Sequence, residues 1–227
     1  ESGKKIINQI KCLGASPDWS RMKFTLDKDM SEAVSHAFVS LYEKGLIYKD
    51  KRLINWDIKL QTAISDLEVE QKEQNGNFFY IKYKLQNNDK YIVVATTRPE
   101  TLFGDCCIAV NPLDKRYKKI IGEKVTIPLT NISIPIIEDE YVDEKKGTGA
   151  LKVTPAHDFN DYDIGKKYNF DFKIIFDTKG KFNNNVPIDY QGLDRLKSRD
   201  LIVEKLKSLG HLKKIDKIKH SVPYGDR

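Results

Sequence analysis

The sequence predicts a mixed α/β fold that is rich in sheet, with a β-barrel-like core and helices at its periphery. Short extended runs separated by turn residues fill the centre of the chain, whereas helical periodicity appears mainly towards its two ends. Because these strands alternate irregularly with few helices, a mixed barrel or sandwich is favoured over a doubly wound parallel sheet. At 227 residues and 40% hydrophobic, the chain is large enough to bury a core.

The amino-terminal part of the chain, residues 1–56, is predicted to be a helical unit that flanks the rest. Apolar side chains recur at helical spacing over residues 30–44, with Asp29 placed to cap the start and Gly45 to stop the end. Residues 57–227 are expected to form the second, sheet-rich unit, with an entry strand and a return strand at its ends.

The second unit is predicted to contain six short strands and two helices. The strands are residues 78–85, 91–97, 106–110, 132–137, 150–154 and 172–176. The helices are residues 161–168 and 193–209, and Gly210 stops the second of them.

Other parts of this unit are predicted to be surface loops and connecting strands. Residues 71–77 and 183–185 are polar enough to be surface loops. Residues 56–70 and 220–227 are predicted to be paired strands that lead into and out of the unit.

The positive charge of the chain is concentrated near its carboxyl-terminal end. The net charge is +6, and residues 195–227 hold ten Lys or Arg against four Asp or Glu, so they supply the whole excess. A tract of this kind can neutralise the phosphates of a nucleic acid. From charge alone, a solvated lysine-rich helix is the simpler explanation.

No pattern in the chain predicts a membrane segment, a disulfide or a metal site. No apolar run approaches the roughly 20 residues that span a bilayer, and no secretory leader is seen, so a soluble cytoplasmic protein is expected. Cys12, Cys106 and Cys107 lack the spacing of a disulfide framework or a CxxC zinc site, and we expect them to be reduced and buried. The four histidines form neither HxH nor HExxH, so we expect no metal and no cofactor.

Hydroxyl groups and one guanidinium gather at residues 95–101, directly after an apolar strand. Thr96, Thr97 and Thr101, together with Arg98, can hydrogen-bond a ribose, a phosphate or a carbonyl oxygen. A strand whose terminal hydroxyls cap its own turn would show the same pattern, so both interpretations stay open.

A cation, a hydroxyl and two carboxylates converge at residues 147–161. Period-two alternation places Lys152 and Thr154 on one face of a strand, before a proline ends it. Asp158 and Asp161 follow in the loop, where catalysis and capping of the next helix explain them equally well.

Other reactive or unusual residues in these segments are given structural interpretations. His157 has a side chain that titrates near neutrality, but a structural role is as consistent with its place as that of a general base. Cys106 and Cys107 lie in an apolar strand, where thiols are usually inert. Gly147 and Gly149 are too sparse for a dinucleotide-binding loop and indicate a tight turn.

Several motifs resemble the connective-peptide insertion, the editing domain, of class I aminoacyl-tRNA synthetases. TTRPET at 96–101 and GTGALKVTPAHD at 147–158 occur in looser form in isoleucyl and leucyl enzymes as well. KVTPAHDFNDYDIG at 152–165 and HSVPYGDR at 220–227 resemble the valyl branch in particular. Further similar stretches are residues 14–21, 52–57 and 65–70.

The resemblance implies that the chain is a part of a larger enzyme. It contains no HIGH-type or KMSKS-type signature, so the site of amino-acid activation is expected outside it. Some relatives have zinc-binding cysteines where this chain has Asp57 and Leu60, and no zinc is inferred. The implied partners are the 3′ end of tRNA(Val) and the remainder of the synthetase, with no membrane and a monomeric state.

The resemblance also implies hydrolysis of the ester of mischarged Thr-tRNA(Val). For valyl enzymes, an apolar pocket is documented to reject threonine by only about a hundredfold, so a second, hydrolytic site with a polar lining removes the error. Asp161 would bind the substrate ammonium, and Lys152, Thr154 and Asp158 would surround the threonine hydroxyl, with these roles partly interchangeable.

The segment that follows the strand would hold the rest of the substrate. Thr96, Thr97, Arg98 and Thr101 would bind the terminal adenosine and the ester while a bound water attacks the carbonyl carbon. Two alternatives stay open at this point. The chain could be an isoleucyl-type editing domain that removes valine, or a tRNA-binding module without activity.

Overall fold

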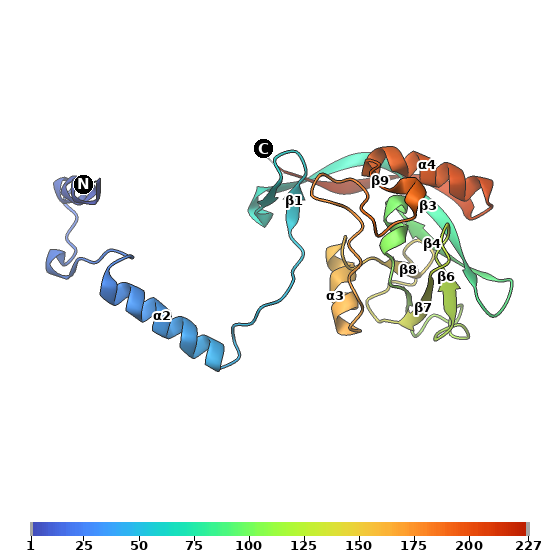
Figure 1. Cartoon of the computed structure of the whole chain (residues 1–227), viewed down its shortest axis with the longest axis horizontal. Helices are drawn as coiled ribbons and strands as arrows, with labels where there is room; N and C mark the ends of the chain where they lie inside the picture. The colour runs from blue at the N-terminus through green and yellow to red at the C-terminus, as the bar shows by residue number, and fades with distance from the viewer. Residues whose placement is uncertain (1, 226–227) are drawn as a thin grey trace. The chain divides into compact units, whose positions relative to one another are not determined.

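The computed structural model describes residues 2–225 and divides the chain into two compact units, residues 1–52 and 53–227 (Figure 1). The prediction of a mixed α/β fold with a barrel-like sheet is confirmed by the second unit. None of the described helices is long and apolar enough to cross a membrane. The last two residues of the predicted return strand, Asp226 and Arg227, lie outside the described residues.

The first unit consists of helices without a buried core. It contains α1 (Ser2–Cys12), the short 3-10 helix η1 (Trp19–Arg21) and α2 (Lys28–Glu43), and none of residues 2–52 is buried. The predicted cap at Asp29 is wrong, because α2 begins one residue before it and Asp29 pairs with Lys23 instead. The prediction that all cysteines are buried is wrong for Cys12, which is exposed at the end of α1.

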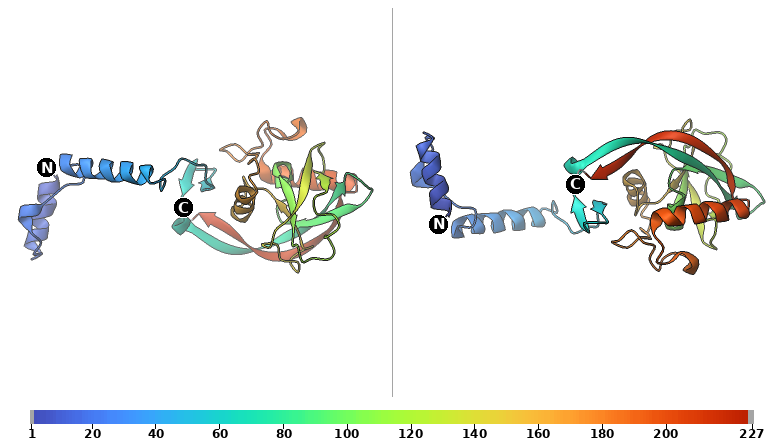
Figure 2. Two further views of the ribbon diagram at one scale, coloured as in Figure 1. Left: turned by 90° about the horizontal axis from the view of Figure 1, so that it is seen from below. Right: turned by 90° about the horizontal axis from the view of Figure 1, so that it is seen from above.

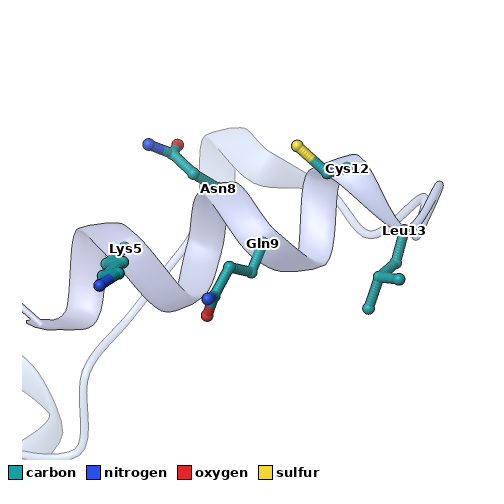
Figure 3. A pocket seen from close by; sticks show the side chains of 5 residues that line it. All are labelled: Lys5, Asn8, Gln9, Cys12 and Leu13. Carbon is teal, nitrogen blue, oxygen red and sulfur yellow. The ribbon is translucent and has the colours of Figure 1, made fainter.

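A hollow of about 600 Å³ runs along α1 and is lined by Lys5, Asn8, Gln9, Cys12 and Leu13 (Figure 3). All five residues belong to one helix and the residue after it, so the hollow is a surface groove. Its polar side chains do not converge on a common point, and it has no features of an active site.

The second unit contains nine strands, two α-helices and three 3-10 helices within the described residues. In chain order they are β1 (Asn55–Asp57), β2 (Thr62–Ile64), η2 (Asp66–Glu68), β3 (Val69–Leu85), β4 (Tyr91–Thr96), η3 (Pro99–Gly104), β5 (Cys107–Val110), β6 (Lys124–Thr126), β7 (Ser133–Glu138), β8 (Ala150–Val153), α3 (Phe159–Lys167), η4 (Ile188–Tyr190), α4 (Arg195–Ser208) and β9 (Leu212–Gly225). Figures 1 and 2 show α3 and α4 against different sides of the main sheet.

The main sheet is a nearly closed barrel. Its strand order is β4-β3-β6-β7-β5-β8, and β8 lies against β4, so the first and last strands of the path meet. All these pairs are antiparallel except β5 with β7, which is parallel. β9 pairs antiparallel with the first part of β3, and the two strands form a long ribbon (Figures 1 and 2).

Two apolar clusters fill the barrel and its side. The larger one contains Ile81, Tyr83 and Val94, which alternation along β3 and β4 points inward, and it extends to α4 through Ile202. The smaller cluster joins Cys107, Val153 and Ile164 beneath α3. These cores hold the ends of β4 and β8 in fixed positions, which is the geometry the candidate site needs.

The structure corrects three of the expected elements. Residues 172–176 form no strand and make one bridge, between Phe176 and Phe182, because their amides and carbonyls bond to loop groups instead. Residues 71–77 are not a loop but part of β3, paired with β9. Of the expected entry strand 56–70, only its last two residues pair with β9, while β1 and β2 form a separate hairpin.

The remaining predicted strands and helices are confirmed with ends within two residues, except that β3 begins at residue 69 instead of 78 and β9 begins at residue 212 instead of 220. Gly210, with φ of 73°, follows α4 as the expected stop. Gly147 and Gly149 both have positive φ values, which confirms the predicted tight turn before β8.

Candidate active site

The segment after β4 folds into a buried 3-10 helix rather than a loop. Thr96 accepts a hydrogen bond on its side-chain oxygen from the backbone N of Arg98 at 3.1 Å. Pro99 then begins η3, and the Thr101 hydroxyl donates to the Arg98 carbonyl at 2.9 Å. All six residues of η3 are buried, so the hydroxyl of Thr101 faces the protein interior at the edge of the barrel.

Lys152 is a buried cation whose three donors are all used. From β8, its Nζ donates to Thr101 Oγ1 at 2.8 Å, to Asp105 Oδ1 at 2.9 Å and to Thr154 Oγ1 at 2.5 Å. An ammonium group has three N–H donors, so this head group is fully satisfied by the protein. Lys152 therefore connects the end of β8 to Thr101 in η3 and to Asp105, which directly follows η3.

Asp105 is a site residue that sequence reasoning missed. It is buried directly after η3, where it accepts hydrogen bonds from Tyr83 Oη at 2.6 Å and from Thr154 Oγ1 at 2.7 Å, as well as from Lys152. Burial raises the pKa of Asp105, and the charge of Lys152 opposes that shift. The available signal was indirect: a lysine in the middle of an apolar strand needs a carboxylate partner if it is buried, and Asp105 directly follows the TTRPETLFG stretch.

Asp161 carries the carboxylate that this cluster leaves open to a ligand. It lies on the first turn of α3, is 7% exposed, and accepts a hydrogen bond on Oδ2 from the backbone N of Thr154 at 2.8 Å. Its Oδ1 receives no hydrogen bond from the part of the chain that the structure describes. Burial raises the pKa of Asp161 to about 7, with Lys152 opposing and Asp158 adding to the shift.

Asp158 caps α3, as one of the two interpretations of its position predicts. Its Oδ1 accepts from the backbone N of Asn160 at 2.9 Å and from that of Asp161 at 3.4 Å. The side chain is exposed, so its second oxygen is open to solvent or to a ligand. Asp158 thus fixes the start of α3, and with it the position of Asp161.

His157 has a structural role. Its Nε2 accepts a hydrogen bond from the backbone N of Ile175 at 3.1 Å, and its ring meets that of Phe176 edge-on. Burial, with the charge of Arg98 adding to it, lowers the pKa of His157 to about 3, so the imidazole is neutral near neutral pH. Its carbonyl accepts from Arg98 Nη1 at 2.7 Å, which joins the two sequence motifs a second time.

A third buried carboxylate, Glu100, belongs to η3 itself. It is 0% exposed and forms a two-pronged ion pair with Arg199 of α4, at 2.9 Å from Nε and 2.8 Å from Nη2. Arg98 Nε lies 3.8 Å from the same carboxylate. The sequence motifs singled out Arg98 but not Arg199, because the two are distant in the chain and only the packing of α4 on η3 brings them together.

The predicted burial of the cysteine pair is confirmed for Cys107 but wrong for Cys106, which is half-buried. Cys107 is buried in β5, with its Sγ 3.9 Å from that of Cys106. The neighbouring thiol and burial raise the pKa of Cys107. Within residues 2–225, no three His, Cys, Asp or Glu side chains gather as the ligands of a metal ion would.

The two predicted motifs meet in one cluster. Hydrogen bonds connect Lys152, Thr154, Asp161 and Thr101 directly, and Arg98 reaches the second motif through the carbonyl of His157. Thr96 and Asp158 act on the backbone of their own motifs. Thr97 is half-buried at the end of β4, and no hydrogen bond joins it to the cluster within the described chain.

The chain thus has a barrel-like sheet with two polar strand ends hydrogen-bonded to each other at its rim. Comparison with known proteins shows the family to which it belongs. A family model described as tRNA synthetases class I (I, L, M and V) matches residues 1–214. The chain therefore belongs to the class I tRNA synthetases.

Within that family, the chain is similar to valine–tRNA ligases along its whole length. It is 53% identical over 227 residues to the enzyme of Pelagibacter ubique, 48% over 247 residues to that of Caulobacter vibrioides, and 51% over 227 residues to that of Nostoc sp.. It covers 26%, 27% and 22% of these proteins, so it spans about a quarter of their length.

A solved structure shares the fold at low sequence identity. The LeuRS of Agrobacterium radiobacter K84, determined as a ternary complex with tRNA and LeuAMS, is 18% identical with a TM-score of 0.50. The match covers 96% of this chain and 36% of the LeuRS chain.

Proposed function

We propose that this chain is the editing part of a valine–tRNA ligase and hydrolyses the ester that joins threonine to tRNA(Val). The observation that carries the proposal is a hydrogen bond between the two motifs at the barrel rim. Lys152 Nζ of the second motif lies 2.8 Å from Thr101 Oγ1 of the first. Had the motifs lain apart, no common site could have served one substrate. The whole-length similarity to valine–tRNA ligases favours threonine over other amino acids as the substrate.

The chemistry of the site suits an aminoacyl ester. Asp161 presents one free carboxylate oxygen in a largely buried setting, where an ion pair with the substrate ammonium is stronger than in water. Neutralising a carboxylate that folding has desolvated adds to the gain on binding. Asp161 is therefore the anchor for the amino group of the substrate.

Selection of threonine over valine would depend on the polar groups at the start of α3. Thr154 and Thr101 are held by Lys152, and the exposed oxygen of Asp158 lies near the start of α3. The hydroxyls of Thr101 and Thr154 are already hydrogen-bonded within the protein, so the open oxygen of Asp158 is the acceptor that a threonine hydroxyl would meet and a valine side chain would leave unpaired. All three donors of Lys152 are used within the protein. We therefore propose that Lys152 positions the two threonine hydroxyls and Asp105 and does not contact the ester directly.

The attacking group in this proposal is a bound water molecule. Arg98, Thr96 and Thr97 would hold the terminal adenosine and orient the ester carbonyl, which is already activated towards hydrolysis. Water adds to the carbonyl carbon, the ester bond to the ribose oxygen breaks, and free threonine leaves the tRNA. No covalent intermediate on the protein is required, in agreement with the inert setting of Cys106 and Cys107.

The central test replaces Asp161 by alanine and measures release of threonine from Thr-tRNA(Val). We expect the rate to fall to that of uncatalysed hydrolysis while the circular dichroism spectrum stays that of the wild type. Asp163→Ala is the matched control, because Asp163 is an exposed aspartate on the same helix. Unchanged deacylation by Asp161→Ala would refute the assignment.

The same assay separates the rival functions. Faster release of valine from Val-tRNA(Ile) than of threonine from Thr-tRNA(Val) would favour an isoleucyl-type editing domain. Salt-dependent tRNA binding without turnover of either substrate would favour a non-catalytic binding module.

A further inference from the structure

Three arginines lie around the buried carboxylate of Glu100, and they differ in the hydrogen bonds that they make within the protein. Arg195 and Arg199 are one turn apart on α4, so their side chains leave the same face of the helix, which packs on η3. Arg199 is committed to both oxygens of Glu100. Arg98, at the start of η3, uses one nitrogen on the carbonyl of His157.

Arg195 is the arginine of the three for which no ion pair is found within the described residues, although Glu100 and Asp194 lie near enough to attract its charge. Its Nε is covered and meets no hydrogen-bond acceptor in the described part of the chain, although the side chain as a whole is half-buried. Burial lowers the pKa of Arg195, and the positive charges of Arg98 and Arg199 lower it further. A desolvated guanidinium beside two others is unfavourable unless an anion offsets the charge.

The stem of Arg195 is fixed by the turn beneath it. Gly180 has φ of 71°, and a β-carbon on it would lie 3.6 Å from Cδ of Arg195 and 3.2 Å from Ile58. The backbone N of Arg195 also donates to the carbonyl of Gly180 at 3.2 Å. The start of α4 is thus held against this turn, and the side chain of Arg195 that leaves it is half-buried.

The charges around this cluster leave an excess of one positive charge. The three guanidiniums carry +3, and the carboxylates that face them are Glu100 and Asp194, which together carry −2. Asp194 is already engaged, because its Oδ1 accepts from the backbone N of Leu196 and Lys197. The remaining charge of +1 matches the single negative charge of one phosphodiester.

We propose that Arg195, with Arg98 and Arg199, binds a phosphodiester of the RNA strand whose terminal nucleoside enters the candidate active site. Guanidinium forks suit the geometry of phosphate oxygens and give charge-assisted hydrogen bonds. Arg98 connects the two sites, since it directly precedes the η3 helix, which carries Thr101 of the polar cluster. The identity of the strand rests on the proposed function, whereas the anion site rests on the arginines alone.

The test compares a charged and a neutral internucleotide linkage. The probes are the dinucleotide cytidylyl-(3′→5′)-adenosine and its methylphosphonate analogue, titrated against the 227-residue chain at low and moderate salt. The wild type should bind the charged probe about tenfold more tightly at low salt. Arg195→Gln should remove most of that preference and reduce the salt dependence of binding by about one ion.

Controls on the same helix keep the test specific. Lys197→Gln removes an equal charge from an exposed position of α4 and should leave the preference for the charged probe intact. Thermal melting checks that each variant is folded. If Arg195→Gln fails to fold, Arg195→Lys replaces it: the charge remains but the fork is lost, and the preference should fall about threefold.

The outcomes separate this inference from the proposed function. No preference for the charged probe in the wild type, or an unchanged preference in the folded Arg195 variant, would overturn the phosphate site. A chain that fails to release threonine but still shows the Arg195-dependent preference would overturn the deacylase and leave the phosphate site standing.

Discussion

Asp161 is a buried carboxylate whose ionisation opposes the stability of the fold. The barrel rim surrounds it with little solvent, and burial raises its pKa to about 7. For an acid, a folded-state pKa above the unfolded value means that ionisation favours the unfolded chain. The folded state therefore loses stability as the pH rises from about 4, the ordinary value of the group, to about 7.

Replacing Asp161 by asparagine should therefore stabilise the protein at neutral and alkaline pH. Asparagine can still accept the hydrogen bond from the Thr154 amide but carries no charge to desolvate. We expect a gain on the order of a few kcal/mol at pH 8, which shrinks as the pH falls and vanishes near pH 4. Urea unfolding of both proteins across this range measures it, and a gain that did not change with pH would show that desolvation of the charged carboxylate is not its cause.

Deacylation should depend on the same ionisation in the opposite sense. In the proposed function, the substrate ammonium binds to the charged form of Asp161, so kcat/KM for Thr-tRNA(Val) should fall about tenfold for each pH unit below 7. The measurement is initial release of threonine between pH 5.5 and 8, after subtraction of uncatalysed hydrolysis. His157→Gln should keep the inflection, because the pKa of His157 is lowered to about 3; loss of the inflection would assign it to the histidine instead.

At the residue scale, the sequence could predict which side chains share a face of a strand, but not their hydrogen-bond partners from elsewhere in the chain. Alternation along β8 placed Lys152 and Thr154 together, and the structure joins them at 2.5 Å. Asp105 and Tyr83 escaped prediction, because only the closure of the barrel brings β3, β5 and β8 around one lysine. Local pattern carries no information about such a long-range pair.

At the scale of elements, the contact between η3 and α4 depends on one buried ion pair. Glu100 is 0% exposed, whereas the side chain of Arg199 is 30% exposed. Loss of the arginine leaves a buried charge without its main partner, while loss of the carboxylate leaves a guanidinium that reaches water. The two partners should therefore contribute unequally.

Arg199→Met should destabilise the protein by about 3 kcal/mol, and Glu100→Gln by only about 1 kcal/mol. The double variant should recover most of the loss seen in Arg199→Met, because it removes the unpaired buried charge. Urea midpoints of the four proteins give the coupling between the two residues. Equal losses in the two single variants, without recovery in the double one, would show that the pair is not the main contact.

Elements with strong apolar periodicity were predicted well, and polar ones were not. Residues 71–77 look like a loop in the sequence, yet they continue β3 because β9 offers a matching partner 140 or more residues later in the chain. In the same way, residues 172–176 have a strand-like composition but no neighbouring strand to pair with, and the ring of His157 takes one of their amides. Pairing partners, not propensity, decided both outcomes.

At the scale of the whole molecule, the two units differ in what can hold them together. Buried residues lie in the second unit, around the barrel, whereas none of residues 2–52 is buried. Helices of 11 and 16 residues without a packed face are marginal in water. The apolar side chains that recur at helical spacing along α2, such as Val34 and Phe38, are exposed.

Removal of residues 1–52 should therefore leave the cooperative unfolding of the barrel almost unchanged. The core clusters, the polar cluster and the ion pair of Glu100 with Arg199 all lie within residues 53–227. We expect the thermal midpoint of the truncated chain to lie within a few degrees of that of the full chain, because the deleted part contributes no buried apolar surface. A second truncated chain, which lacks only residues 1–27 and so retains α2, serves as the control. If the shorter protein lost its sharp transition while the control kept it, α2 would be part of the folding unit, and the stability of the barrel could not be attributed to its own core.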